Sequence, residues 1–199
     1  MDIRKAVEND VPVLAEMLSR AFDKDPIESW TIRMDKKRPE ALRSLFTYIL
    51  NECVPHGEVT VTEGLDACAV WVPPGVWTEP PSMIQSLLML PTLLSWTGLG
   101  RLRRYMEMDA AEFAHRPKGH HFYLAILGVD PLCRGHGLGS TLLDHTLSRL
   151  DELGLPAYLE NSNADNMALY TRVGFTVVDA IQLSGGGPIM WSMWREPRQ

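Results

Sequence analysis

The chain has 199 residues, of which 45% are hydrophobic and 22% charged, a composition that is ordinary for one folded domain. This composition excludes collagen-like, coiled-coil and disordered chains. The 25 acidic and 19 basic residues give a formal net charge of −6, which disfavours nucleic acid as a partner and leaves room only for a local basic pocket.

The first part of the chain predicts a strand, two helices and a pair of strands. Residues 2–5 have the pattern of a short strand, and apolar residues at helical spacing over 11–18 predict the first helix. Pro26 breaks this pattern, and a second helix is expected over about residues 39–51. Two β-like runs separated by turn residues within 58–72 are typical of a hairpin.

A long apolar insertion follows, over about residues 76–118. No charged residue occurs in 82–100, and arginines follow it, as at a membrane boundary. A spanning helix needs about 20 predominantly apolar residues, whereas this stretch holds several polar residues and a central Pro91. We therefore expect a helical insertion that is buried or faces the substrate, and no membrane span.

The second part begins with the strongest strand of the chain, at about residues 120–130. A glycine-rich turn, a helix, a short strand, a second helix ending at Gly174 and two closing strands follow it. This order predicts a single α/β domain over residues 1–199, built around a mixed sheet flanked by helices.

The cysteine pattern and the N-terminus favour a cytoplasmic protein. Cys53, Cys68 and Cys133 are an odd number of widely spaced residues without a CxxC pair, which is typical of reduced thiols. No signal peptide is visible at the charged N-terminus. His120 and His121 have no third partner at metal spacing and are expected at the surface, so no metal site is predicted.

The turn between the strongest strand and the following helix carries the clearest chemical signal. It reads Arg134-Gly135-His136-Gly137-Leu138-Gly139-Ser140. Its glycines allow close backbone approach, and the helix that follows presents unpaired N–H groups. This combination suits an anion, most naturally a pyrophosphate, with Arg134 as an added charge. A tight turn that needs glycine only for its geometry is the alternative.

Two motifs then point to one family. Arg134, Gly137 and Gly139 match an R-x-x-G-x-G acyl-CoA signature, and Leu169-Tyr170 with Gly174-Phe175 matches L-Y-x-x-x-G-F. With about 30 residues between them, the chain resembles the GNAT N-acetyltransferases over nearly its whole length. Within that superfamily it is most similar to the puromycin N-acetyltransferases and their relatives, at AVWVPPG, HRPKGHHFYLAILGVDP and PAYLENS.

The resemblance implies a mixed, mostly antiparallel sheet with the insertion between its third and fourth strands, and acetyl-CoA as co-substrate. The backbone of residues 134–140 would hold the pyrophosphate. The strand at Leu127, Gly128 and Val129 would hold the pantetheine arm and polarise the thioester carbonyl, with Gly128 permitting a strand distortion. Asn166 resembles the asparagine that binds pantetheine in this family. Asn163 is an alternative helix cap.

Two residues are the catalytic candidates. Tyr170 occupies the family's tyrosine position, and a phenol can protonate the departing thiolate, although a packing role is the alternative. Glu160, at a strand end, is the first candidate for the base, directly or through water. A plain surface carboxylate is the alternative role. The weaker candidates for the base are His121, Glu112 and Asp109. No nucleophile elbow is present, so direct transfer in a ternary complex is expected.

The acceptor pocket is expected between the segment after the first helix, the insertion and the C-terminal hairpin. The residues predicted to bind the acceptor are Trp30, Trp77, Tyr105 and Glu107, and further candidates are Phe22, Asp25, Glu28, Trp96, Met106, Trp191 and Trp194. Aromatic and acidic side chains suit an amphipathic cationic amine, such as an aminonucleoside antibiotic. The alternatives are a protein lysine or N-terminus as acceptor, or a CoA sensor without catalysis. Both a monomer and a homodimer are compatible with the sequence.

Overall fold

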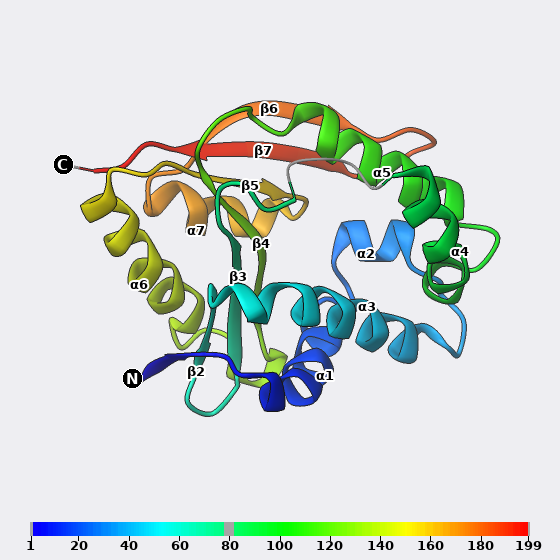
Figure 1. Cartoon of the computed structure of the whole chain (residues 1–199), viewed down its shortest axis with the longest axis horizontal. Coiled ribbons are helices and arrows are strands. Elements are labelled where there is room, and N and C mark those ends of the chain that lie inside the picture. The colour runs from blue at the N-terminus through cyan, green and yellow to red at the C-terminus, as the bar shows by residue number, and fades with distance from the viewer. Residues whose placement is uncertain (1, 78–81, 199) are drawn as a thin grey trace.

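The computed structural model describes residues 2–77 and 82–198. In this part of the chain one sheet runs in the order β1-β2-β3-β4-β5-β7-β6, and every neighbouring pair is antiparallel except β4–β5 (Figure 1). The predicted mixed, mostly antiparallel sheet is confirmed. The strands are β1 (Ile3–Lys5), β2 (Val59–Thr62), β3 (Ala67–Val72), β4 (Phe122–Val129), β5 (Ala157–Asn161), β6 (Thr176–Gln182) and β7 (Ile189–Arg195).

Helices cover both faces of the sheet. Side chains alternate along β3, so that Cys68 and Val70 pack with α1 and α3, whereas Ala69 and Trp71 pack with α6 and α7. The helices are α1 (Val11–Ala21), α2 (Pro26–Thr31), α3 (Arg38–Cys53), α4 (Met83–Thr97), α5 (Leu102–His115), α6 (Leu138–Leu153) and α7 (Met167–Arg172), with short 3-10 turns at Glu8–Asp10, Val54–His56, Pro131–Cys133 and Ala164–Asn166.

The sequence pattern predicts only a break at Pro26, but the structure has a helix, α2, that begins there. Proline is favoured at the first helical position because its φ is preset and no N–H is needed. Asp25 caps this helix: its carboxylate accepts hydrogen bonds from the backbone N–H of Ile27 (2.8 Å) and Glu28 (3.3 Å). This cap holds the start of α2 in place, and the side chains of Asp25 and Glu28 are turned toward the interior of the molecule.

The predicted helical insertion is present between β3 and β4 as α4 and α5, and residues 78–81 of it lie outside the described residues. Leu93 and Trp96 of α4 pack against the core under α3. The N-terminal turns of α4 are exposed instead, and Met83 is 88% exposed. Among the described helices, none is long and apolar enough to cross a membrane.

Strands β4 and β5 separate soon after they meet. Their parallel pairing includes only Phe122 with Ala157 and Tyr123 with Tyr158. Beyond that point β4 continues to pair with β3, and β5 with β7, so the two strands diverge. The edge of β4 that faces β5 is therefore left without a strand partner over 124–129, which suits an extended ligand with amide groups.

The distortion of β4 is not at Gly128, as the sequence predicts, but at Ala125. The register with β3 shifts there, because Ile126 lies opposite Val70 and Leu124 opposite Trp71. Gly128 pairs regularly and serves close packing instead. A Cβ atom at this position would clash with Leu18 Cδ2 on α1 and lie 3.2 Å from Cε2 of Phe22, the residue that follows α1.

We expect Gly128→Ala to lower the free energy of unfolding by about 1–3 kcal/mol, because the added methyl group overpacks the contact with Leu18. Urea denaturation of the variant measures this loss. Gly100→Ala is the control, because a Cβ atom at Gly100 has open space around it. An unchanged unfolding free energy for Gly128→Ala would mean that α1 moves aside at no cost.

Candidate active site

The glycine-rich turn has the geometry of an anion site. Gly135 and Gly137 adopt φ of 82° and 78°, a left-handed conformation that favours glycine. Gly137 begins α6 without a side-chain cap, and its carbonyl accepts the first helical hydrogen bond, from Thr141. The N–H groups of residues 138–140 therefore have no partner within the helix. They lie next to an exposed loop, as pyrophosphate binding requires.

The same turn is anchored to the end of α1. Arg134 Nη2 donates to the carbonyl of Ala21 (2.7 Å), and Arg20 donates to Asp130 Oδ2 (2.5 Å). His136 lies in the turn with its Nδ1 3.2 Å from the carbonyl of Cys133. These contacts fix the position of the Arg134 side chain at the exposed rim of the turn.

Gly137→Ala is expected to raise the Kd for CoA about 5- to 30-fold, because a left-handed φ is strained for alanine and relaxation would misalign the N–H groups of α6. Calorimetric titration with CoA measures the effect. Gly154→Ala is the matched control, since Gly154 has φ of 66° at the other end of the same helix. If both variants weaken CoA binding equally, the turn has no direct role.

Glu160 lies on β5 where the strand has separated from β4, opposite Ser192 of β7. Both carboxylate oxygens are buried, and their nearest donors are the phenols of Tyr123 and Tyr158, which lie close without complete hydrogen-bond geometry. Burial raises the pKa of this carboxyl, while Arg116 and the nearby phenols of Tyr123 and Tyr158 oppose the rise. Glu160 is therefore a buried carboxylate that forms no ion pair with a described residue, not the surface carboxylate of the alternative interpretation.

Tyr170 lies on α7, on the other face of the sheet, and is 7% exposed. Its ring packs edge-on against Phe175 at 6.1 Å between centroids. Burial raises the pKa of the phenol, and the nearby carboxylate of Asp25 raises it further. The phenol therefore remains protonated at neutral pH. Asn166 lies one turn before it, and Asn163 caps the preceding 3-10 turn by accepting from the N–H of Asp165 (3.0 Å).

The predicted acceptor residues do not all meet. Trp30 is buried in a cluster with Met108, Ile181, Leu183 and Met190, so it packs α2 against α5 and the β6–β7 hairpin. Tyr105 is on the inner side of α5, near Glu28. Glu107 differs from the prediction: its carboxylate accepts from the N–H and Oγ of Ser184, both at 2.6 Å. It ties α5 to the β6–β7 turn and is not part of the buried site.

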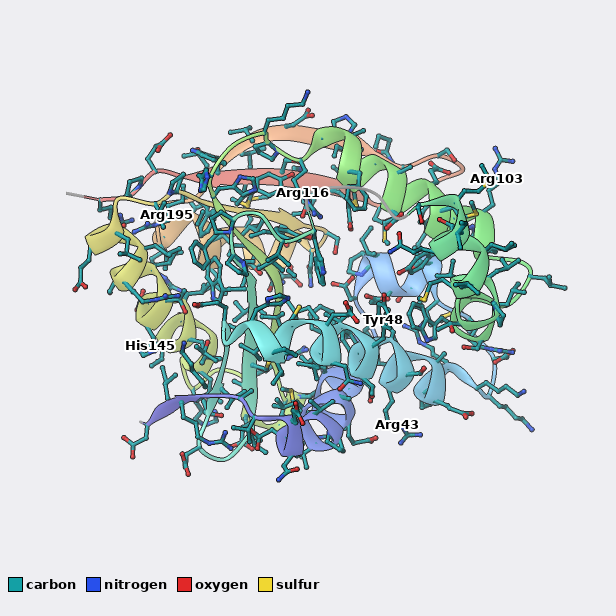
Figure 2. All side chains as sticks on the ribbon, viewed as in Figure 1. Arg43, Tyr48, Arg103, Arg116, His145 and Arg195 are labelled. Atoms are coloured by element: carbon teal, nitrogen blue, oxygen red, sulfur yellow. The ribbon has the colours of Figure 1, made fainter. Side chains whose placement is uncertain are left out.

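Trp77 borders a cleft of about 330 Å³ between the loop after β3 and the segment that joins α5 to β4. Arg116 lies in its wall and donates to the carbonyl of Trp77 (3.1 Å) while its guanidinium covers the Tyr123 ring at 4.3 Å. Figure 2 shows Arg116 within the molecule, whereas Arg103, near the start of α5, extends outward. The cleft thus reaches Tyr123, which adjoins Glu160.

His121 is buried, contrary to the predicted surface position. Its ring packs between Tyr158 and Trp194, at 5.7 and 5.5 Å between centroids, and its Nδ1 lies 3.1 Å from the carbonyl of Gly119. Burial lowers the pKa of His121, so the imidazole is neutral at neutral pH. These contacts give His121 a packing role at the base of the site.

Sequence reasoning named four carboxyls separately, as candidates for the base or the acceptor pocket, but did not predict that they form one group. We call this group the acidic cluster: Glu28 of α2, Asp109 and Glu112 of α5, and Glu160. Burial raises the pKa of each, that of Glu28 to about 8, and the Glu160 carboxylate raises that of Glu112 further. A sequence signal existed, because Tyr105, Asp109, Glu112 and Arg116 recur at spacings of four, three and four along one helix face.

No group of three or more His, Cys, Asp or Glu side chains within residues 2–77 and 82–198 is arranged to hold a metal ion. The described residues bring together a turn with free backbone N–H groups, an open strand edge beside it, and a buried carboxylate and a buried phenol on opposite faces of the sheet.

Comparisons with known proteins agree with this geometry. The model of the acetyltransferase (GNAT) family matches residues 97–175, which include the glycine-rich turn and Tyr170. An uncharacterized N-acetyltransferase of Schizosaccharomyces pombe is 23% identical over 192 residues, 92% of this chain and 78% of that protein. A mycothiol acetyltransferase of Propionibacterium freudenreichii is 41% identical over 82 residues, so the match spans 40% of this chain and only 25% of that protein.

Two solved structures extend the likeness to the whole chain. The first, described as histone acetyltransferase HPA2 and related acetyltransferase from Corynebacterium glutamicum, has a TM-score of 0.72 and 25% identity, covering 99% of this chain and 96% of that one. The second, a polyamine N-acetyltransferase of Drosophila melanogaster, has a TM-score of 0.68 and 17% identity, covering 98% and 99%. At 17% identity, the similarity to the Drosophila enzyme concerns the fold alone.

Proposed function

We propose that this chain is an N-acetyltransferase of the GNAT family, and that it transfers the acetyl group of acetyl-CoA directly to the amine of a small cationic molecule in a ternary complex. The observation that carries the proposal is the buried carboxylate of Glu160 at the gap between β4 and β5, which forms no ion pair with a described residue. Such a group is costly to keep unless it binds a cation or takes a proton.

The residues along the gap fit the co-substrate. The N–H groups at the start of α6 and Arg134 would hold the pyrophosphate. The free edge of β4 at residues 127–129 would pair with the amides of the pantetheine arm, with Asn166 as a further partner. This arrangement would direct the thioester into the gap, between Glu160 on one face and Tyr170 on the other.

The reaction then follows from the two buried groups. The amine nitrogen attacks the thioester carbonyl carbon, and backbone N–H groups of residues 127–129 stabilise the developing oxyanion. Glu160 accepts the proton lost by the amine, directly or through water. As the C–S bond breaks, Tyr170 donates its proton to the sulfur and CoA leaves as the thiol. Glu160 thus accepts the proton that leaves the amine, and Tyr170 supplies the proton that the sulfur gains.

The acceptor side favours a small molecule. Helix α5 lies beside α2 and the β6–β7 hairpin, and α4 packs against α3 and α5 (Figure 1), so both helices border the expected acceptor pocket, where a protein substrate would need an open groove. Aromatic and acidic side chains around Tyr105 and Glu28 suit a cationic amine, and an aminonucleoside antibiotic is one amphipathic example. The likeness in fold to a polyamine N-acetyltransferase supports the same class of acceptor.

A thiol-release assay with acetyl-CoA and a panel of acceptors tests the proposal. The panel contains aliphatic amines, puromycin, a lysine peptide and a peptide with a free N-terminus. We expect release with at least one small amine and no acetyl-cysteine intermediate by mass spectrometry. Release only with peptides would favour the protein acetyltransferase alternative. CoA binding without release for any acceptor would favour the sensor.

A further inference from the structure

The acidic cluster holds more carboxyls than acetyl transfer needs. One base suffices for the reaction, and Glu160 has both oxygens buried without an ion-pair partner among the described residues. Glu160 is also the strongest charged neighbour of Glu112, with Asp109 and Glu28 within electrostatic reach of the same group. Glu28, Asp109 and Glu112 form no side-chain hydrogen bond or ion pair within residues 2–77 and 82–198.

The nearby arginines do not neutralise the cluster. Arg116 is committed to the carbonyl of Trp77 (3.1 Å) and to the Tyr123 ring (4.3 Å), and it forms no ion pair with a described residue. Arg38, close to Glu28, is bonded to the Asp23 carboxylate (2.9 Å) and to backbone carbonyls, among them that of Glu28 (3.0 Å). Arg116 is thus the arginine near Glu160, Glu112 and Asp109, and Arg38 the one near Glu28, and neither forms an ion pair with these carboxylates.

The positions of these carboxyls describe a line. Glu112 adjoins Glu160, and Asp109 follows three residues earlier on the same face of α5, about 4.5 Å along the helix axis. Tyr105 follows about 6 Å further, and Glu28 of α2 is a charged neighbour of both Tyr105 and Glu112. α2 contacts α5 through Trp30 and Met108, which holds Glu28 near this face of α5. An aliphatic chain along this face would pass Glu112 and Asp109, with Glu28 close by.

We propose that the acceptor is a linear dicationic amine, whose first amino group reacts beside Glu160 while its second cationic group is bound by Glu112, Asp109 and Glu28. The inference rests on the proposed function and narrows its substrate class. The spacing along α5 places the second cation about 5–10 Å from the reacting nitrogen, which corresponds to a diamine of about four to six carbons. Burial and mutual repulsion disfavour the ionised form of these carboxyls, and a bound cation would stabilise it.

Kinetics with matched acceptors test the inference. Each α,ω-diamine of about four to six carbons is compared with the n-alkylamine and the amino alcohol of the same length. We expect kcat/KM for the diamine to exceed that for both analogues about tenfold or more. In Glu112→Gln and Glu28→Gln this ratio is expected to fall several-fold toward one. Glu152→Gln, an exposed change on α6, keeps the native ratio.

Binding without catalysis separates this inference from the proposed function. With CoA bound, the diamines are expected to raise the Tm of the native chain more than their monoamine analogues do, and this difference disappears in Glu112→Gln. If no acceptor releases thiol but the diamine effect on Tm persists, the transferase proposal fails and the dication site stands. Equal effects of diamines and monoamines on both kcat/KM and Tm would overturn the dication site.

Discussion

Replacing Tyr170 by phenylalanine is expected to lower kcat about 10²- to 10⁴-fold while the Kd for CoA changes little. The substitution removes only the hydroxyl group, because the ring contact with Phe175 is kept. Burial and the Asp25 carboxylate raise the pKa of the phenol, so the native side chain carries its proton at every assay pH near neutrality. Such a phenol can donate to a thiolate but cannot act as a base.

Thiol release at saturating acceptor gives kcat for this variant, and calorimetric titration gives the Kd for CoA. Tyr48→Phe is the matched control, because Tyr48 lies on α3 and is 40% exposed. An unchanged kcat in Tyr170→Phe would remove the phenol from the proton transfer. If CoA affinity fell as much as kcat, Tyr170 would serve to shape the cofactor site and not to donate a proton.

The parts of the site that depend on neighbouring residues in sequence could be predicted. The glycine-rich turn is one of these, since Gly135 and Gly137 have the left-handed φ for which glycine is suited. The position of Glu160 at a strand end also follows from its local pattern. Its burial does not, because the strand end is covered only when β4 and β5 diverge and α5 packs over the gap.

Contacts between distant segments explain the remaining differences. Glu107 and Glu112 are both acidic residues of α5, yet five residues on a helix turn them through about 140°, to well-separated sides. The packing of Met108 and Tyr105 against α2 decides which side of α5 faces inward. The sequence pattern does not predict α2, because it indicates only a break at Pro26. Gly128 is likewise required because Leu18 of α1 packs closely against it, and α1 lies more than a hundred residues away in sequence.

The exposed turns of α4 also show that burial cannot be predicted from an apolar sequence alone. Its apolar sequence predicts a buried or substrate-facing helix, and Leu93 and Trp96 do reach the core. Ile84 and Leu87 are on the outside, because a helix that packs along one stripe leaves its opposite side uncovered even when that side is apolar. Burial therefore follows from the partner surface, not from the hydrophobicity of the segment alone.

Glu160→Gln is expected to lower kcat/KM about 10²- to 10⁴-fold near neutral pH, because the amide keeps the shape of the side chain but accepts no proton. The dependence on pH identifies the group. Burial raises the pKa of Glu160, so the fraction of the native enzyme with an ionised base increases as pH rises through a value above that of an ordinary glutamate. The native-to-variant rate ratio should increase over the same range, and the titration of the acceptor amine cancels in that ratio.

A second substitution distinguishes Glu160 from any other titrating group. The positive charge of Arg116 lowers the pKa of Glu160, so Arg116→Met is expected to move the rise in kcat/KM to higher pH without abolishing it. A rise that stays in place in Arg116→Met, or that persists unchanged in Glu160→Gln, would assign the base to another residue. Because Arg116 contacts Trp77 and Tyr123 and not the carboxylate, the shift would act through space, and added salt would not reproduce it at a buried site.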